Sequence, residues 1–187
     1  MSPVRPLFLV LTSVALLRCA VGQWRSKRLR ERFFYAAIEG IVEEGWTDEN
    51  SHGVAAAYNQ NSYLQEGVAK LMFTNSSSVW TLSASSPEFE YAVKSSDRLV
   101  SRLTSPMHDE ADPLVVVLSV KDQHSALLAE QRFELADYWS LYHVYFSNLR
   151  QNAADARRRI ASVELRADTD REHVVLFVGY MYLDVKM

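Results

Sequence analysis

Residues 114–120 read LVVVLSV, and this stretch marks the point where the sequence changes its pattern. Apolar residues recur mostly at helical spacing before residue 113, and they alternate with polar residues after it. A short run of β-branched and apolar residues is typical of a buried strand. We therefore expect helices in the first part of the chain and strands in the second.

Further strands are predicted after this one. In residues 127–135, LLAEQRFEL, alternation indicates a strand with one solvent-exposed face, reached through the turn KDQHS. Residues 138–147 form another strand, with Tyr142 and Val144 on one face and Trp139 and His143 on the other. The last two strands are expected at 160–166 and 173–183, as a hairpin around the turn ADTDRE.

Three helices are predicted before residue 113. Residues 29–44 place Phe33, Ala37 and Ile41 four apart, which indicates an amphipathic helix. Residues 53–72 read as a second helical stretch or two short helices. A third starts after the capping residue Ser86. The expected fold class is α+β, with N-terminal helices packed on a curved antiparallel sheet of four to five strands.

The N-terminus has the features of a secretory signal peptide. Arg5 precedes the apolar run at 7–17, and small residues lead to an expected cut after Gly22. The run is too short for a membrane span, although an uncleaved anchor stays an alternative if Arg18 reaches the interface. We predict a secreted, extracellular protein in which residues 1–22 are the signal peptide, with no membrane attachment after cleavage.

A second processing site is predicted directly after the leader. Arg25, Lys27 and Arg28 match the Arg-x-Lys/Arg-Arg pattern of furin-type convertases, so residues 23–28 form a short propeptide if the chain is cut before Leu29. The alternative is a solvated basic stretch leading into a helix. The remaining 29–187 are expected to form one domain.

Charge and cysteine content narrow the class of protein. The formal net charge of the chain is −3, and it becomes −5 when Arg5 and Arg18 are removed with the leader. Removal of the three basic residues of 23–28 would bring the net charge to −8. An acidic domain repels the phosphate backbone, so nucleic acid is disfavoured as a partner. The single cysteine, Cys19, lies in the leader, so neither a disulfide nor a thiolate nucleophile is expected in the mature domain.

The stretches RFFYAAIEGIVEEGWT and VVVLSVKDQHSALLAEQRFELADYWSLYHVYF resemble the NTF2-like, or cystatin-like cone, superfamily. Asp137, Tyr138 and Trp139 match the aspartate-tryptophan-type segment that ends its strand–turn–strand unit. The resemblance implies a long helix packed into the concave face of a bent sheet. It also implies a pocket in that concave face, and in the enzymes of the superfamily an Asp or His in this pocket acts as general base. The final hairpin departs from this pattern.

Candidate site residues follow from this picture. Trp80, Trp139 and Tyr142 are the predicted pocket-lining residues, and His143 is the candidate catalytic base, with a structural histidine as the alternative. Tyrosines can instead line a binding surface, since each buries apolar area and keeps a polar tip. The candidates for such a surface are Tyr142, Tyr145, Tyr180 and Tyr182.

The sequence also contains a glycosylation motif and two acidic segments. Asn75-Ser76-Ser77 is an N-glycosylation acceptor and predicts an exposed loop in a secreted chain. The acidic segments around Asp109 and Asp170 lack the spacing of known metal-binding motifs, so we expect neither a metal nor a cofactor.

The function predicted from sequence is a secreted, non-enzymatic binding or interaction domain. Its expected partner is an unknown protein or a small apolar ligand, and its oligomeric state is open. Two alternatives stay open: a small secreted isomerase- or lyase-type enzyme that uses His143, and a convertase-processed signalling protein.

Overall fold

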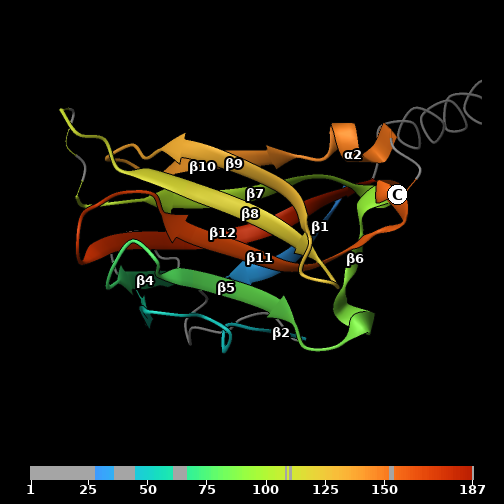
Figure 1. Ribbon diagram of the computed structural model, residues 1–187, viewed down its shortest axis with the longest axis horizontal. Coiled ribbons are helices and arrows are strands. Elements are labelled where there is room, and N and C mark those ends of the chain that lie inside the picture. The colour runs from blue at the N-terminus through green and yellow to red at the C-terminus, as the bar shows by residue number, and fades with distance from the viewer. Residues whose placement is uncertain are drawn as a thin grey trace, which may run out of the picture.

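The computed structural model describes residues 28–35, 45–60, 67–107, 109, 111–151 and 154–186. Within these residues the strands form two antiparallel sheets that stack face to face (Figure 1). The described chain is therefore a β-sandwich, and the predicted α+β fold is wrong.

The first sheet, which we call the β12 sheet, has the order β10-β7-β12-β4-β3. The strand β1 also pairs with β12, because β4 pairs only with the first part of this long strand and β1 with the rest. The strands are β1 (Arg28–Tyr35), β3 (Val54–Gln60), β4 (Gly67–Phe73), β7 (Ser96–Thr104), β10 (Ser140–Tyr145) and β12 (Val174–Lys186).

The second sheet, the β11 sheet, has the order β2-β5-β11-β8-β9, with β6 beside β11. Its strands are β2 (Trp46–Thr47), β5 (Val79–Ala84), β6 (Tyr91–Ala92), β8 (Val115–Asp122), β9 (Leu127–Glu134) and β11 (Arg159–Ala167). The helical segments are η1 (Pro87–Phe89), η2 (Val93–Ser95), α2 (Ser147–Gln151) and η3 (Asp155–Arg157). None of the helices in the described ranges is long and apolar enough to span a bilayer.

The described parts of the three predicted helices are mostly strands. Residues 29–44 begin with β1, and their part after residue 35 lies outside the described residues. The stretch 53–72 contains β3 and β4, and the third predicted helix contains η1, β6, η2 and most of β7. Residues four apart lie on one face of a helix but also on one face of a strand, because the strand period is two. The spacing of the apolar residues alone therefore did not distinguish a helix from a strand.

The predicted late strands lie in β8, β9, β10, β11 and β12, and the turn KDQHS joins β8 to β9 as a hairpin. The predicted hairpin around ADTDRE is wrong. Its first strand, β11, belongs to one sheet and its second, β12, to the other. The connection therefore crosses between the sheets, as one from β9 to β10 also does.

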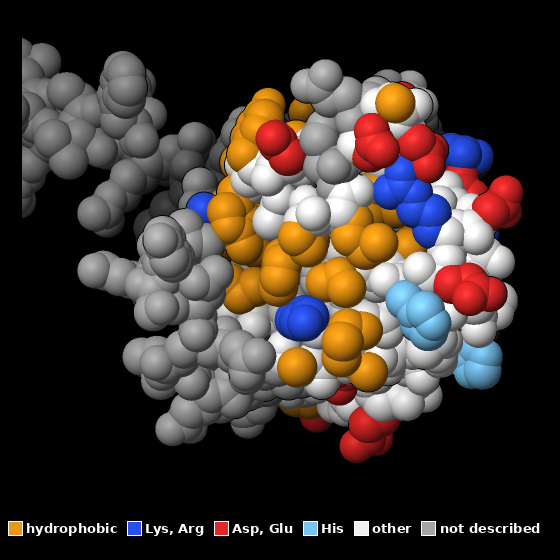
Figure 2. Space-filling model, turned by 90° about the vertical axis from the view of Figure 1, so that its left-hand side faces the viewer, with side chains coloured by type: hydrophobic (Ala, Val, Ile, Leu, Met, Phe, Trp, Pro, Cys, Tyr) orange, Lys and Arg blue, Asp and Glu red, His pale blue; other side chains and the backbone are white. Residues whose placement is uncertain are grey.

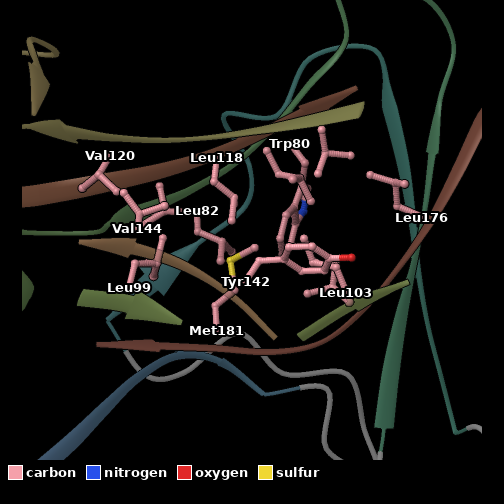
Figure 3. Packing of buried hydrophobic residues seen from close by; sticks show 14 of the residues in the cluster. Trp80, Leu82, Leu99, Leu103, Leu118, Val120, Tyr142, Val144, Leu176 and Met181 are labelled. Carbon is pink, nitrogen blue, oxygen red and sulfur yellow. The ribbon is translucent and has the colours of Figure 1, made fainter. Parts of the chain in front are cut away.

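Side chains from both sheets fill the interior. Trp80 of β5, Leu118 of β8 and Leu103 of β7 are almost fully buried, and Met181 and Tyr142 pack in the same cluster (Figure 3). Full burial of one large apolar side chain stabilises the fold by about 2 kcal/mol. A core shared by two sheets holds the sandwich together without the helices that the sequence indicated.

Candidate ligand-binding face

The outer faces of the two sheets differ in chemistry. The outer face of the β11 sheet is polar, and its cations are matched by acids on neighbouring strands. The ion pairs are Lys121 with Glu164 at 2.6 Å, Arg166 with Glu130 at 3.4 Å, and Arg132 with Asp168. Such a face is typical of a solvated surface.

The outer face of the β12 sheet is rich in aromatic residues and arginine. Strand register sets the arrangement, since directly opposed residues of an antiparallel pair share a face. Three rows cross β10, β7 and β12 in this order, and together with Trp139 they make up what we call the aromatic face: Tyr145, Arg98, Asp184; His143, Val100, Tyr182; and Leu141, Arg102, Tyr180.

Arg102 stacks between aromatic rings on this face. Its guanidinium carbon lies 5.0 Å from the centroid of the Trp139 ring and 5.8 Å from that of Tyr180. The Tyr180 ring in turn lies 5.7 Å from the Tyr182 ring. Four half-buried side chains from three segments thus form one stacked row of rings and a cation.

Gly179 lies next to this stack. The pairing of β12 with β7 shifts between Val178 and Tyr180, so Gly179 is the extra residue of a bulge. A Cβ at this position would lie 3.4 Å from Cδ of Arg102 and 3.5 Å from Cζ3 of Trp139. A Cβ would therefore make ordinary van der Waals contacts with both side chains, whereas a longer side chain at this position would collide with them.

A second arginine anchors the other end of the face. Arg98 Nε donates to Asp184 Oδ2 at 2.7 Å, and the Asp184 side chain is 5 % exposed. Arg98 Nη1 lies 3.0 Å from His143 Nδ1, and its guanidinium carbon lies 6.0 Å from the Tyr145 ring centroid. Since arginine only donates, His143 Nδ1 accepts this bond and the imidazole is neutral. Burial, and then the charge of Arg98, lowers the pKa of His143.

Part of the aromatic face is open to solvent. Leu141 is 52 % exposed and Tyr145 is 59 % exposed. The outward register continues to β4, where Lys70 stands opposite Phe177 and Met72 opposite Val175. The end of the sandwich shown in Figure 2 also carries hydrophobic side chains gathered around one basic side chain.

The predicted pocket between helices and a bent sheet is not the arrangement found, because the described residues pack as two sheets. Trp80 and Tyr142, predicted to line it, are core residues. The Tyr142 hydroxyl accepts a hydrogen bond from the backbone N–H of Ala136 at 3.0 Å, and its ring lies 5.1 Å from Phe133. Trp139 alone of the three predicted lining residues lies on the outer face.

His143 stands outside the interior as well. The alternation along β10 was predicted correctly, but it turns Tyr142 and Val144 inward and His143 outward. The acid nearest in the network, Asp184, is bonded to Arg98 and not to the imidazole. The structure thus places His143 in a hydrogen-bonded network with Arg98 and Tyr145 on the outer face of the β12 sheet.

Asn75 lies in the exposed turn between β4 and β5. Its Oδ1 accepts hydrogen bonds from the backbone N–H of Ser77 at 2.9 Å and from the Ser77 hydroxyl at 2.6 Å. Both residues of the sequon that carry its chemistry are therefore at the surface; whether a glycan is attached there stays a prediction.

Of the processing residues, Gly22, Arg25 and Lys27 lie outside the described residues. Arg28 is the first residue of β1 and pairs with Lys186 of β12. A cut before Leu29 would remove this one register pair and leave the rest of β1 in the chain.

Within the described ranges, no three His, Cys, Asp or Glu residues are grouped so that they could hold a metal ion. Asp112, from one acidic segment, is engaged by Arg171 across the loops that precede β8 and β12. Asp168, from the other, pairs with Arg132. Tyr145, Tyr180 and Tyr182 were candidates for a binding surface from the sequence, whereas Arg98 and Arg102, which lie on the same face, were not. Their spacing with Val100, every second residue of β7, was the available signal.

Comparison with known proteins identifies the class of fold. No family model and no curated protein sequence matches the chain. Solved structures of family 29 carbohydrate-binding modules do match, including a glutamate-to-arginine mutant with a TM-score of 0.57, 9 % identity, and coverage of 85 % of this chain and 94 % of that one. Mutants of such a module complexed with cellulohexaose and with mannohexaose also match. Each has a TM-score of 0.56 and 9 % identity, and each match covers 85 % of this chain and 94 % of the module.

These neighbours are all-β sandwiches, and the resemblance to the NTF2-like superfamily is therefore wrong. At 9 % identity the likeness shows the fold. In the neighbouring module, alanine mutants of a tyrosine, an arginine, two lysines and two aspartates were made to probe ligand recognition. A non-enzymatic binding domain, predicted from the sequence, is consistent with this class of structure.

Proposed function

We propose that this chain is a glycan-binding domain that holds an oligosaccharide on the aromatic face. The observation that carries the proposal is the stack of Trp139, Arg102, Tyr180 and Tyr182 on one outer sheet face. The opposite outer face carries paired charges instead. The small apolar ligand expected from the sequence is replaced by a sugar, in line with the oligosaccharides bound by the structural neighbours.

The chemistry of the face suits a sugar. One side of a pyranose ring presents C–H groups, which are attracted to the negative face of an aromatic ring. Arginine edges donate hydrogen bonds to hydroxyl oxygens. Because the rings stack on Arg102 and on one another, little conformational freedom is lost on binding.

Calorimetric titration of the full chain with cellulohexaose, mannohexaose and a panel of acidic hexasaccharides tests the proposal. Leu141→Ala and Leu127→Ala form a matched pair, since both leucines are 52 % exposed, Leu141 on the aromatic face and Leu127 on β9. We expect Trp139→Ala to weaken binding at least tenfold, on the order of a hot-spot loss. Leu141→Ala should weaken it less and Leu127→Ala should leave it unchanged. Absence of binding to every hexasaccharide would contradict the proposal.

We also propose that the domain works outside the cell. The predicted signal peptide and the exposed sequon at Asn75 support this. Mass spectrometry of the protein recovered from the medium of a eukaryotic host tests it. A start at Gln23 or at Leu29 and a glycosidase-sensitive mass on the Asn75 peptide are the expected results. Retention of the whole chain inside the cell would contradict it.

A further inference from the structure

The strand β10 lies at an edge of the β12 sheet (Figure 1). Among the described strands it pairs only with β7, in an uninterrupted antiparallel register. The backbone N–H of Phe146 donates to the carbonyl of Asp97 at 3.0 Å, which fixes the phase of this ladder. The backbone groups of an antiparallel strand point alternately to its two sides. Those of Leu141, His143 and Tyr145 therefore point away from β7, to the side on which no described strand pairs with β10.

β10 lacks the features that normally protect an edge strand, which are charged side chains, proline and bulges. Residues 140–145, SLYHVY, contain no Asp, Glu, Lys or Arg, no proline and no glycine. The edge strand of the other sheet, β9, carries Glu130, Arg132 and Glu134, and its register with β8 is interrupted. At the opposite edge of the β12 sheet, β3 carries small alanines at 55–57. The edge formed by β10 is thus unprotected and built from larger side chains.

Large apolar residues are exposed along this edge. Tyr138, just before β10, is 69 % exposed, Leu141 is 52 % exposed and Tyr145 is 59 % exposed. They are three of the five exposed large hydrophobic residues in the described ranges. Single apolar residues on a surface are ordinary, but apolar residues gathered on an unprotected edge strand indicate a surface that pairs with another strand.

The sequence of β10 is complementary to itself in one antiparallel register. When His143 stands opposite the same residue of a second β10, Leu141 stands opposite Tyr145 at both ends. These are the residues whose backbone groups point away from β7, so each opposed pair can exchange two hydrogen bonds. Directly opposed residues share a face, so Tyr142 meets Val144 on the inward side. The two most exposed apolar residues of the strand thus cover each other.

The charges near β10 are compatible with this pairing. Arg98 Nη1 donates to His143 Nδ1 at 3.0 Å, so the imidazole is neutral and two imidazoles can face each other without repulsion. In the row that begins with Tyr145, Arg98 and Asp184 are bonded to each other at 2.7 Å. The register therefore brings no like charges directly opposite one another, which would be destabilising.

We propose that a second copy of this chain pairs along β10, so that two β12 sheets continue into one another around a two-fold axis at His143. A second copy fits because one register matches the exposed leucine of each strand with the exposed tyrosine of the other. Such a contact uses the same surface on both copies and closes at the dimer. Because opposed residues share a face, the aromatic faces of the two copies become one surface. The dimer does not depend on ligand binding.

Sedimentation velocity of the full chain over a range of concentrations tests the dimer. One short strand per copy makes a small interface, so we expect a reversible equilibrium with a dissociation constant on the order of 100 μM. Leu141→Lys should weaken it at least about tenfold, because a lysine protects an edge strand. Leu127→Lys is the matched control and should leave it unchanged, since Leu127 is also 52 % exposed and lies on the edge strand β9. The melting temperature of each variant reports whether it is folded.

Cysteine variants test the register. In a Cys19→Ser background, the variants Leu141→Cys and Tyr145→Cys are oxidised separately and as a mixture. Directly opposed residues have Cα atoms about 5.5 Å apart, which suits a disulfide, so the mixture should form cross-linked dimers. Neither variant alone should cross-link, because the two copies of residue 141 lie at least about 13 Å apart along the strands.

Each other result overturns the proposal. A monomer at every concentration does so, and so does self-association that Leu141→Lys leaves intact, because it comes from another part of the chain. Growth beyond the dimer contradicts the closed two-fold contact, and cross-linking of a single cysteine variant contradicts the register. A monomer that binds a synthetic SLYHVY peptide would mean that the edge accepts a strand of another protein. None of these measurements uses a sugar, so failure of the dimer and failure of glycan binding are distinguishable.

Discussion

The guanidinium carbon of Arg102, on β7, lies 5.0 Å from the centroid of the Trp139 ring, which comes from the connection into β10. The two residues meet because β10 pairs with β7 at the sheet edge, and Gly179 of the adjacent β12 lies next to both. A cation held over an aromatic ring by neighbouring strands is a rigid feature, and it is the centre of the face to which we assign ligand binding.

Gly179 gives a graded test of this arrangement. The added Cβ of Gly179→Ala would make ordinary van der Waals contacts at 3.4 Å to Arg102 and 3.5 Å to Trp139, so binding should change little. The larger side chain of Gly179→Leu should push the indole away and weaken hexasaccharide binding about tenfold. Calorimetric titration of both variants checks this; equal loss in both would contradict the role given to the indole.

The lowered pKa of His143 predicts that the stability of the protein depends on pH. Its pKa in the folded protein is lowered by burial and by Arg98, while the Asp184 charge acts in the opposite direction. The unfolded chain therefore binds more protons, and the contribution of His143 is complete above its ordinary value of 6.5 and is lost as pH falls through the lowered pKa. Besides Arg98 and Asp184, the described polar group facing the imidazole is the Tyr145 hydroxyl, at 3.3 Å.

The measurement is the melting temperature at about pH 7.5 and about pH 5, in the wild type and in His143→Gln. The amide oxygen of glutamine can still accept from Arg98 but does not titrate. We expect a smaller acid-induced drop in the variant. An identical drop in both proteins would show that His143 is not part of the acid response.

Replacement of two buried serines of β7 by alanine should change the stability of the protein in opposite directions. Ser101 is fully buried, and its hydroxyl has no hydrogen-bond partner among the described residues. Ser96 is equally buried, but its hydroxyl donates to the carbonyl of Ala92 at 2.9 Å. Ser101→Ala should therefore leave stability unchanged or raise it by up to about 1 kcal/mol, and Ser96→Ala should lower it by about 1 kcal/mol. Urea denaturation of both variants is the measurement; a loss at Ser101 as large as that at Ser96 would refute the assignment.

Arg158 closes the β8–β9 hairpin onto the start of β11. Its Nε donates to Asp122 Oδ2 at 2.8 Å, and the Asp122 side chain is 4 % exposed. Although burial acts to raise the pKa of Asp122, hydrogen bonds from the Ala126 backbone, Arg158 and the His124 backbone hold it below its ordinary range. Arg158→Ala should therefore cost about 2 kcal/mol, because it leaves a buried carboxylate without its cation.

The control for Arg158 is Arg132→Ala. The Arg132 side chain is 67 % exposed in its pair with Asp168, so its removal should cost less than about 1 kcal/mol. Thermal or urea unfolding separates the two variants. A loss at Arg132 that matches the loss at Arg158 would mean that burial does not control the strength of these pairs.

The sequence predicted the strands after residue 113 but not those before it. In β9 and β10 the apolar positions alternate, and in β8 they form one continuous β-branched run, which was enough to place each strand. In β7 the buried Ser101 stands between Leu99 and Leu103, so the apolar residues recur four apart and the strand resembles a helix. A polar residue at a core position conceals a period of two.

The residues of the proposed ligand face were predicted only in part. Tyrosines on a strand suggested a surface, but the sequence placed Trp139 in a pocket and His143 at a catalytic position. Sequence gives the side of each strand on which a residue lies, but it does not say which strands are neighbours. Arg102 meets Trp139 and Tyr180 only after β10, β7 and β12 are aligned.

By itself, then, the amino-acid sequence determined the late strands and the surface position of the sequon at Asn75, because these depend on neighbours along the chain, while the leader stays a prediction from the same kind of local pattern. The tertiary structure decided that the first half is also β, that β11 and β12 belong to opposite sheets, and that one outer face gathers rings and cations. The reason is that sheet order and register bring together residues far apart in sequence, and a local pattern carries no information about such partners.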